Sequence, residues 1–149
     1  MQNFFTGKFF PQKKFAILSA FARKFFLCAS VPVVIKFHAM KTKIEIAKNV
    51  AGGKGDVVKK HILGPAELND KTKMFAEVTL APGASIGFHK HTGESETYYI
   101  LAGTGTYNDD GAIRTVSRGD VTFTPSGKSH GIENTGTENL VFVALILRD

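Results

Sequence analysis

Glycine and proline recur every few residues beyond residue 40, and this punctuation limits what the chain can form. Fourteen of the 15 glycines lie in residues 40–149. Inside a helix, glycine costs about 1 kcal/mol and proline about 3 kcal/mol relative to alanine, so long helices are excluded there. The segments between these breaks are short and contain many β-branched and aromatic residues. Short strands at regular spacing are typical of an all-β sandwich or barrel.

The alternation of apolar and polar residues locates the individual strands. It is clearest over residues 74–80, where Met74, Ala76, Val78 and Leu80 are expected to share one face. Residues 140–147 form the most apolar run, which we expect to be buried on both faces. The sequence Asn-Asp-Asp-Gly at 108–111 predicts a hairpin turn. Strands are expected at residues 44–47, 59–63, 74–80, 85–91, 96–101, 103–107, 113–116, 121–124, 131–134 and 140–147.

Residues 1–39 differ from the rest of the chain in composition. They hold nine of the 13 phenylalanines and six Lys or Arg residues, but no Asp or Glu. Residues 40–149 hold 13 basic and 13 acidic residues, so the net charge of +6 belongs to the N-terminal segment. A neutral body does not indicate a nucleic-acid-binding surface. We expect an N-terminal extension over 1–39 and one domain over 40–149.

Three interpretations of the extension remain open: a targeting segment, a membrane-surface helix, or a translation start at Met40. Arg23 and Lys24 divide its apolar runs, so neither run reaches the roughly 18 residues that a membrane span needs. We therefore expect a cytoplasmic protein without a stable membrane span, unless residues 1–39 direct it to an organelle or to export. The single cysteine, Cys28, excludes an intrachain disulfide and a multi-cysteine zinc site.

Two histidines two residues apart mark a candidate metal site. In a strand, His89 and His91 point to the same face, and Glu94 and Glu96 follow closely. Imidazole nitrogens together with a carboxylate oxygen suit a transition metal. Spacing alone does not decide between the two acids, and a solvated charged loop over 90–96 is the alternative interpretation. His130 lies 34 residues beyond Glu96, after a Pro-Ser-Gly turn.

These spacings resemble the two sequence motifs of the cupin family, G-x5-H-x-H-x(3,4)-E-x6-G and G-x5-P-x-G-x2-H-x3-N. Every fixed position of both patterns is matched. The resemblance implies metal ligands at His89, His91, Glu96 and His130, and so favours Glu96 over Glu94. The first motif is read at Gly83, His89, His91, Glu96 and Gly103, and the second at Gly119, Pro125, Gly127, His130 and Asn134.

The resemblance extends to small single-domain cupins of the cupin 2 conserved barrel type, with oxalate-decarboxylase-like and phosphomannose-isomerase-like members. It implies a single small jelly-roll β-barrel over about 70–149. Residues 40–69 would add N-terminal strands, which in small cupins often pair with a second subunit. Because a small barrel of short strands leaves sheet edges open, we expect a homodimer.

The implied ligand set also indicates a function. Three imidazoles and one carboxylate leave about two positions open on an octahedral ion, as in working rather than structural metal sites. Manganese or iron is favoured, and nickel, zinc and copper are compatible. We expect a metal-dependent enzyme acting on a small oxygenated or carboxylate-bearing substrate, of decarboxylase, isomerase or dioxygenase type. The alternative is a non-enzymatic module that binds a sugar or organic acid through the metal.

No catalytic residue is assigned by the sequence. Tyr98 and Glu94 are candidates for a position beside the metal ligands, because Tyr98 shares the face of Glu96 and Glu94 lies next to the ligands in sequence. Packing of Tyr98 in the core is the alternative. His38 and His61 are interpreted as satisfied surface or core residues, and Phe75, Phe88, Phe123 and Phe142 as core or interface residues.

Overall fold

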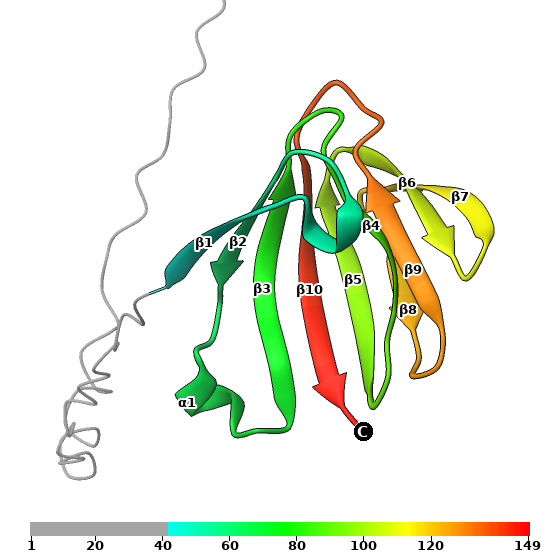
Figure 1. Ribbon diagram of the computed structural model, residues 1–149. Helices are drawn as coiled ribbons and strands as arrows, with labels where there is room; N and C mark the ends of the chain where they lie inside the picture. The colour runs from blue at the N-terminus through cyan, green and yellow to red at the C-terminus, as the bar shows by residue number, and fades with distance from the viewer. Residues whose placement is uncertain (1–41) are drawn as a thin grey trace, which may run out of the picture. The chain divides into compact units, whose positions relative to one another are not determined.

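The computed structural model describes residues 42–149, which form antiparallel strands with one short α-helix and one 3-10 turn (Figure 1). The predictions made for residues 1–39 lie outside the described residues. Of the described helices, none has the length and apolar character to cross a membrane. The strands are β1 (Lys43–Lys48), β2 (Asp56–His61), β3 (Thr72–Leu80), β4 (Ser85–Lys90), β5 (Glu94–Ala102), β6 (Thr104–Asp109), β7 (Ala112–Ser117), β8 (Val121–Thr124), β9 (Ser129–Glu133) and β10 (Leu140–Arg148), with η1 at Val50–Gly52 and α1 at Pro65–Leu68.

The strands form two sheets that lie face to face. The larger has the order β1-β2-β3-β10-β5-β8, and the smaller has the order β4-β9-β6-β7. Strands adjacent in a sheet are mostly distant in sequence, as in a jelly roll. The all-β jelly-roll prediction is confirmed, although the barrel is not closed by hydrogen bonds between its two sheets. β1 and β2 extend the chain's own larger sheet.

The predicted hairpin turn joins β6 and β7. Asp110 and Gly111 have φ angles of 50° and 101°, which match a tight turn with two left-handed residues. Glycine and aspartate tolerate this conformation better than most residues. The prediction from residues 108–111 is therefore confirmed.

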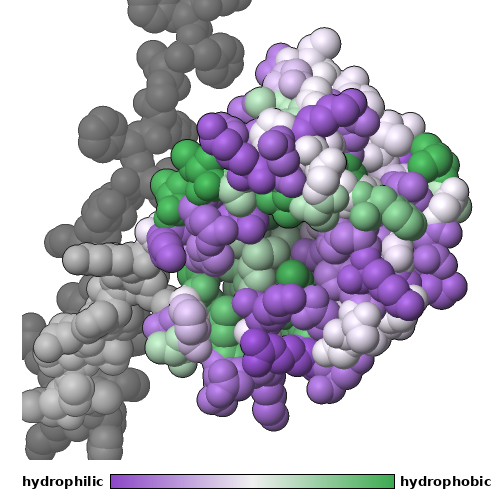
Figure 2. Space-filling view, viewed as in Figure 1, coloured by the Kyte–Doolittle hydropathy of each residue, from purple (hydrophilic) through white to green (hydrophobic). Residues whose placement is uncertain are grey.

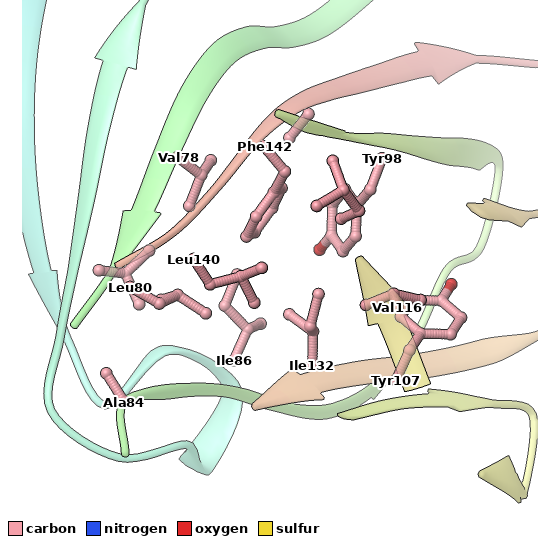
Figure 3. Packing of buried hydrophobic residues seen from close by; sticks show 13 residues of the cluster. Val78, Leu80, Ala84, Ile86, Tyr98, Tyr107, Val116, Ile132, Leu140 and Phe142 are labelled. Carbon is pink, nitrogen blue, oxygen red and sulfur yellow. The ribbon is translucent and has the colours of Figure 1, made fainter. Parts of the chain in front are cut away.

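The core lies between the inner faces of the two sheets (Figure 3). β3 contributes the alternating residues that the sequence predicted, including Val78 and Leu80. Phe142 enters from β10, and Ile132 faces it from the smaller sheet. Burying each such side chain stabilises the fold by about 1.5–3 kcal/mol. The same packing fixes the register of the strands that carry the histidines.

The prediction that residues 140–147 are buried on both faces is wrong. In β10, Leu140 and Phe142 are fully buried, whereas the intervening Val141 and Val143 are only half-buried. The reason is that β10 lies in the middle of the larger sheet, and the smaller sheet covers only one face of it. The apolar run therefore supplies one core face and one outer face.

Candidate metal centre

Motif residues far apart in sequence meet where β4 and β9 pair. His89 on β4 lies opposite His130 on β9. His91 follows β4, and its backbone carbonyl accepts a hydrogen bond of 2.8 Å from the amide of Gly127, while its own amide donates to the carbonyl of Lys128. The turn that contains Gly127 thus fastens the second motif to the first.

Close approach of the backbone near the first histidine requires a glycine. A β-carbon at Gly87 would collide with the backbone carbonyl of Ala51, in the η1 turn. A side chain at this position would therefore push η1 away from β4. Gly87 lies two residues before His89, so this contact also positions the start of the site.

Three imidazoles and one carboxylate converge on one point. The Oε2 atom of Glu96 lies 2.9 Å from Nε2 of His130, 3.2 Å from Nε2 of His91 and 4.0 Å from Nε2 of His89. One donor atom from each of the four residues lies within 4.8 Å of the others. His91, Glu96 and His130 are buried, whereas the side chain of His89 is 28% exposed. The cluster is therefore approached from the side of His89.

Each imidazole is held through its other ring nitrogen. Nδ1 of His89 donates to the carbonyl oxygen of Gly87 at 2.9 Å, and Nδ1 of His91 donates to the carboxylate of Glu94 at 3.2 Å. Because a carbonyl and a carboxylate only accept hydrogen bonds, these contacts leave Nε2 as the nitrogen that can bind a metal once it is deprotonated. Such partners fix the tautomer and the ring orientation of metal-ligating histidines. The donor set fits a divalent first-row ion.

The third imidazole has a partner that the sequence did not indicate. Nδ1 of His130 lies 2.8 Å from the hydroxyl of Tyr107, which lies 2.8 Å from Oγ1 of Thr124. All three residues are completely buried. Tyr107 comes from β6, outside both motifs, and the only sequence signal for it is the inward parity of that strand. Its role depends on packing between the sheets.

The carboxylate of Glu96 is held as an anion. Burial raises its pKa, but hydrogen bonds from His130 and His91 lower it to about 2. The hydroxyl of Tyr98 also donates to Oε2 of Glu96 at 3.1 Å. Burial, reinforced by the charge of Glu96, raises the pKa of Tyr98 well above its ordinary value, so Tyr98 remains a protonated donor. Tyr98 is thus both buried in the core and bonded to the cluster.

The electrostatic surroundings of the imidazoles differ. Burial lowers the pKa of His89, which favours the neutral form that binds metals. The hydrogen bond to Glu96 raises the pKa of His91, so protons compete more strongly with a metal ion for Nε2 of His91. Metal affinity at such a site depends on pH, because the nitrogens must be deprotonated to bind the ion.

Glu94 begins β5, two residues before the strand start that the sequence predicted at residue 96. Its carboxylate holds His91 and also accepts a hydrogen bond of 2.8 Å from Nζ of Lys73. It does not belong to the four-residue cluster. Glu94 therefore forms a hydrogen bond with the candidate ligand His91 but is not itself one of the four candidate metal ligands.

A cavity of about 250 Å³ opens beside His89 and Glu96. Figure 2 shows a hollow on this face, with hydrophobic side chains inside it and hydrophilic side chains around it. His61 lines the cavity, although the sequence suggested only a satisfied surface or core residue; it does form a hydrogen bond with Glu45. The lining also includes Val50, Lys59, Lys73, Met74, Val78, Ile86, Tyr98, Ala144 and Ile146.

Known proteins share both the sequence and the fold. A family model described as a cupin domain matches residues 76–146. The oxalate-binding protein of Thermotoga maritima is 48% identical over 103 residues, which cover 69% of this chain and 85% of that protein. The oxalate decarboxylase of Bacillus subtilis is 36% identical over 84 residues, but these make up only 22% of that protein.

A solved structure supports the same relationship. The crystal structure of a predicted oxalate decarboxylase from Thermotoga maritima superposes with a TM-score of 0.70 at 45% identity. The superposition covers 73% of this chain and 95% of the other. More distant solved structures, such as the cupin domain of Schizosaccharomyces pombe Cnp3 at 13% identity and a TM-score of 0.58, share the fold alone.

Proposed function

Since this chain belongs to the cupin family, we propose that it binds a small carboxylate through a divalent transition metal ion. The ion would be held by His89, His91, Glu96 and His130. One observation carries this proposal: three oriented imidazole nitrogens and an anionic oxygen converge at the edge of a cavity. Four protein ligands leave about two positions of an octahedral ion for a carboxylate.

We propose manganese or iron as the ion, and nickel, zinc and copper are also compatible with this donor set. A bound ion would act as a Lewis acid toward the oxygens of the carboxylate. The protein's own residues orient the ligand atoms: Tyr98 donates to Glu96, and Glu94 and Tyr107 hold His91 and His130. The name of the 48% identical relative, an oxalate-binding protein, supports a small carboxylate such as oxalate.

Binding of a carboxylate through the metal is the function that the cavity supports most directly. A proton-transfer enzyme needs an acid or base free to reach the substrate. Among the described carboxylates at or beside the cavity, Glu96 belongs to the metal cluster, Glu94 is paired with Lys73, and Glu45 is paired with Lys59. An enzyme of decarboxylase, isomerase or dioxygenase type is the second candidate, favoured by the similarity to oxalate decarboxylase.

The test combines metal analysis with calorimetry. We expect purified protein to hold close to one divalent ion per chain and to bind oxalate only when this ion is present. His130→Ala should lose the metal while circular dichroism shows retained β-structure, and His61→Ala should keep it. Oxalate binding that survives removal of the metal would refute the proposal. Consumption of oxalate by the loaded protein would favour the enzyme.

We also propose a homodimer formed through the outer face of the larger sheet. Five apolar side chains on this face are 47–63% exposed, which a lone chain would leave in water. One cross-strand row on it runs from Ile44 on β1, through the charged Lys60 and Glu77, to Tyr99 and Val121 at the opposite edge. Light scattering should give twice the chain mass, and Phe123→Glu should give the single mass. A wild-type monomer at high micromolar concentration would exclude this interface. The five side chains are Ile44, Ile46, Tyr99, Val121 and Phe123.

We also propose a cytoplasmic location and a division of the chain between residues 1–39 and 40–149. Both depend on whether the N-terminal segment is retained in the mature protein. Mass spectrometry of the protein isolated from its natural source would decide this. A mature chain that begins near residue 40 would favour processing or a start at Met40.

A further inference from the structure

Two polar side chains of β2 point inward, on the face of the larger sheet that also carries core residues. Val57 on this strand is fully buried, and Lys59 and His61 lie two and four residues further on, on the same face. Their cross-strand neighbours on β3 are the core residues Val78 and Ala76. Lysine is rarely enclosed in this way unless it is paired. Both side chains line the cavity that His89 and Glu96 also line.

Glu45 on β1 holds both groups in place. Its Oε1 atom lies 3.2 Å from Nζ of Lys59, and its Oε2 atom lies 3.2 Å from Nε2 of His61. Hydrogen bonds from Lys59 and then His61 lower the pKa of Glu45, so the carboxylate is an anion at neutral pH. The ammonium of Lys59 has three N–H donors, and its contact with Glu45 uses one. Donors remain for a molecule in the cavity.

Besides Lys73, which is paired with Glu94, the cavity has polar groups at two places, with apolar walls between them. β2 and β5 are separated by β3 and β10, which is three interstrand steps of about 4.8 Å, or about 14 Å between backbones. The side chains of Lys59 and Glu96 both line the cavity, from strands that lie three interstrand steps apart. Met74, Val78 and Ile146 line the wall between them.

We infer that Lys59 provides a second anion-binding group beside His61, and that the ligand is a dicarboxylate with a short hydrocarbon body. One carboxylate binds at the metal cluster, the apolar wall packs against the hydrocarbon, and the other carboxylate accepts hydrogen bonds from the ammonium of Lys59. Oxalate has no hydrocarbon body, so it engages the metal end alone. This inference rests on the proposed function, because the first carboxylate requires the metal.

The test measures how much the second negative charge of the ligand contributes to its affinity. Glutarate and its half-amide, 5-amino-5-oxopentanoate, have nearly the same shape but differ by one negative charge. We expect calorimetry on the full chain loaded with Mn²⁺ to show glutarate binding about tenfold more tightly than the half-amide, since a charged hydrogen bond is about twice as strong as a neutral one. Lys59→Met should reduce this preference to about twofold at unchanged metal content.

Two further variants separate a binding role from a structural one. Lys60→Met removes the neighbouring charge on the outer face of the same strand, and it should leave the preference intact. Glu45→Gln releases Lys59 and His61 from their carboxylate, so glutarate should bind several-fold more tightly. A merely structural pair would weaken binding in both Lys59→Met and Glu45→Gln. If Lys59→Met fails to fold, the effect of Glu45→Gln on glutarate affinity decides between a binding role and a structural role for Lys59.

The outcomes also separate this inference from the proposed function. If oxalate binds the loaded protein but glutarate gains nothing over its half-amide, the second anion-binding group is wrong and the metal-dependent function stands. If Lys59→Met leaves the preference for glutarate over its half-amide unchanged, the second anion-binding group is likewise wrong. If neither oxalate nor glutarate binds the loaded protein, the proposed function itself is wrong.

Discussion

Replacing Tyr107 with phenylalanine tests how a residue outside both motifs controls the metal cluster. The hydroxyl of Tyr107 lies 2.8 Å from both Nδ1 of His130 and Oγ1 of Thr124. With the Nε2 lone pair of His130 free for a metal, Nδ1–H donates to Tyr107, and the Tyr107 hydroxyl donates to Thr124. Phenylalanine preserves the ring and its contact with Arg114, whose guanidinium lies 5.1 Å from the ring centre. Only the hydroxyl is lost.

The expected magnitude follows from burial. His130 and Thr124 are completely buried, so water cannot readily replace the missing hydroxyl. Leaving a buried polar partner unsatisfied costs about 1–3 kcal/mol, and we expect Tyr107→Phe to lose about this much of its free energy of unfolding. Removing the partner of a metal-ligating histidine weakens metal binding by about 10–100-fold. The metal dissociation constant should therefore rise by at least about tenfold.

The assay is a competition titration of metal against a chelator, with urea unfolding of the metal-free protein beside it. Tyr99→Phe is the matched control, because Tyr99 lies 47% exposed on the outer face of the larger sheet. It should leave metal affinity unchanged. If Tyr107→Phe binds metal within about twofold of the wild type, the hydroxyl of Tyr107 does not orient His130 for metal binding.

Four further outcomes are expected. Glu96→Gln should weaken metal binding far more than Glu94→Gln, because the amide oxygen of Gln at position 94 can still accept the hydrogen bond from His91. A metal titration in which Glu94→Gln has the larger effect would contradict the choice of Glu96 as the ligand. In metal-free protein, Glu96 has a pKa of about 2 against an ordinary value of 4.5, so its contribution to stability is present above pH 4.5 and is lost as the pH falls toward 2. Urea unfolding of wild type and Glu96→Gln across this range should converge at the acid end. Phe142→Ala should cost about 3–5 kcal/mol in the same measurement, since Phe142 is completely buried; a loss under about 1 kcal/mol would mean that the core collapses around the gap. A chain of residues 40–149 should fold alone, and an insoluble product beside soluble full-length protein would argue against the proposed domain boundary.

Local features of the sequence determined much of the fold. Glycine and proline spacing excluded long helices, and the alternation over residues 74–80 correctly assigned Val78 and Leu80 to the core. The motif spacing singled out four residues that the structure brings within 4.8 Å of one another. The parity of β5 correctly placed Tyr98 on the same inward face as Glu96. These features are readable because turns and side-chain alternation depend on neighbouring residues.

Only the tertiary structure decided which distant segments meet. Nothing local to Tyr107 marks it as the partner of His130, 23 residues away on another strand. Likewise, Lys59 and His61 alternate like any exposed polar residues, yet the register of β2 on β3 turns them into the cavity. The apolar run in β10 gave no sign that one of its faces would remain uncovered. Strand register and sheet stacking depend on the packing of the whole core, because a shift by one residue would turn every side chain of a strand to the opposite face.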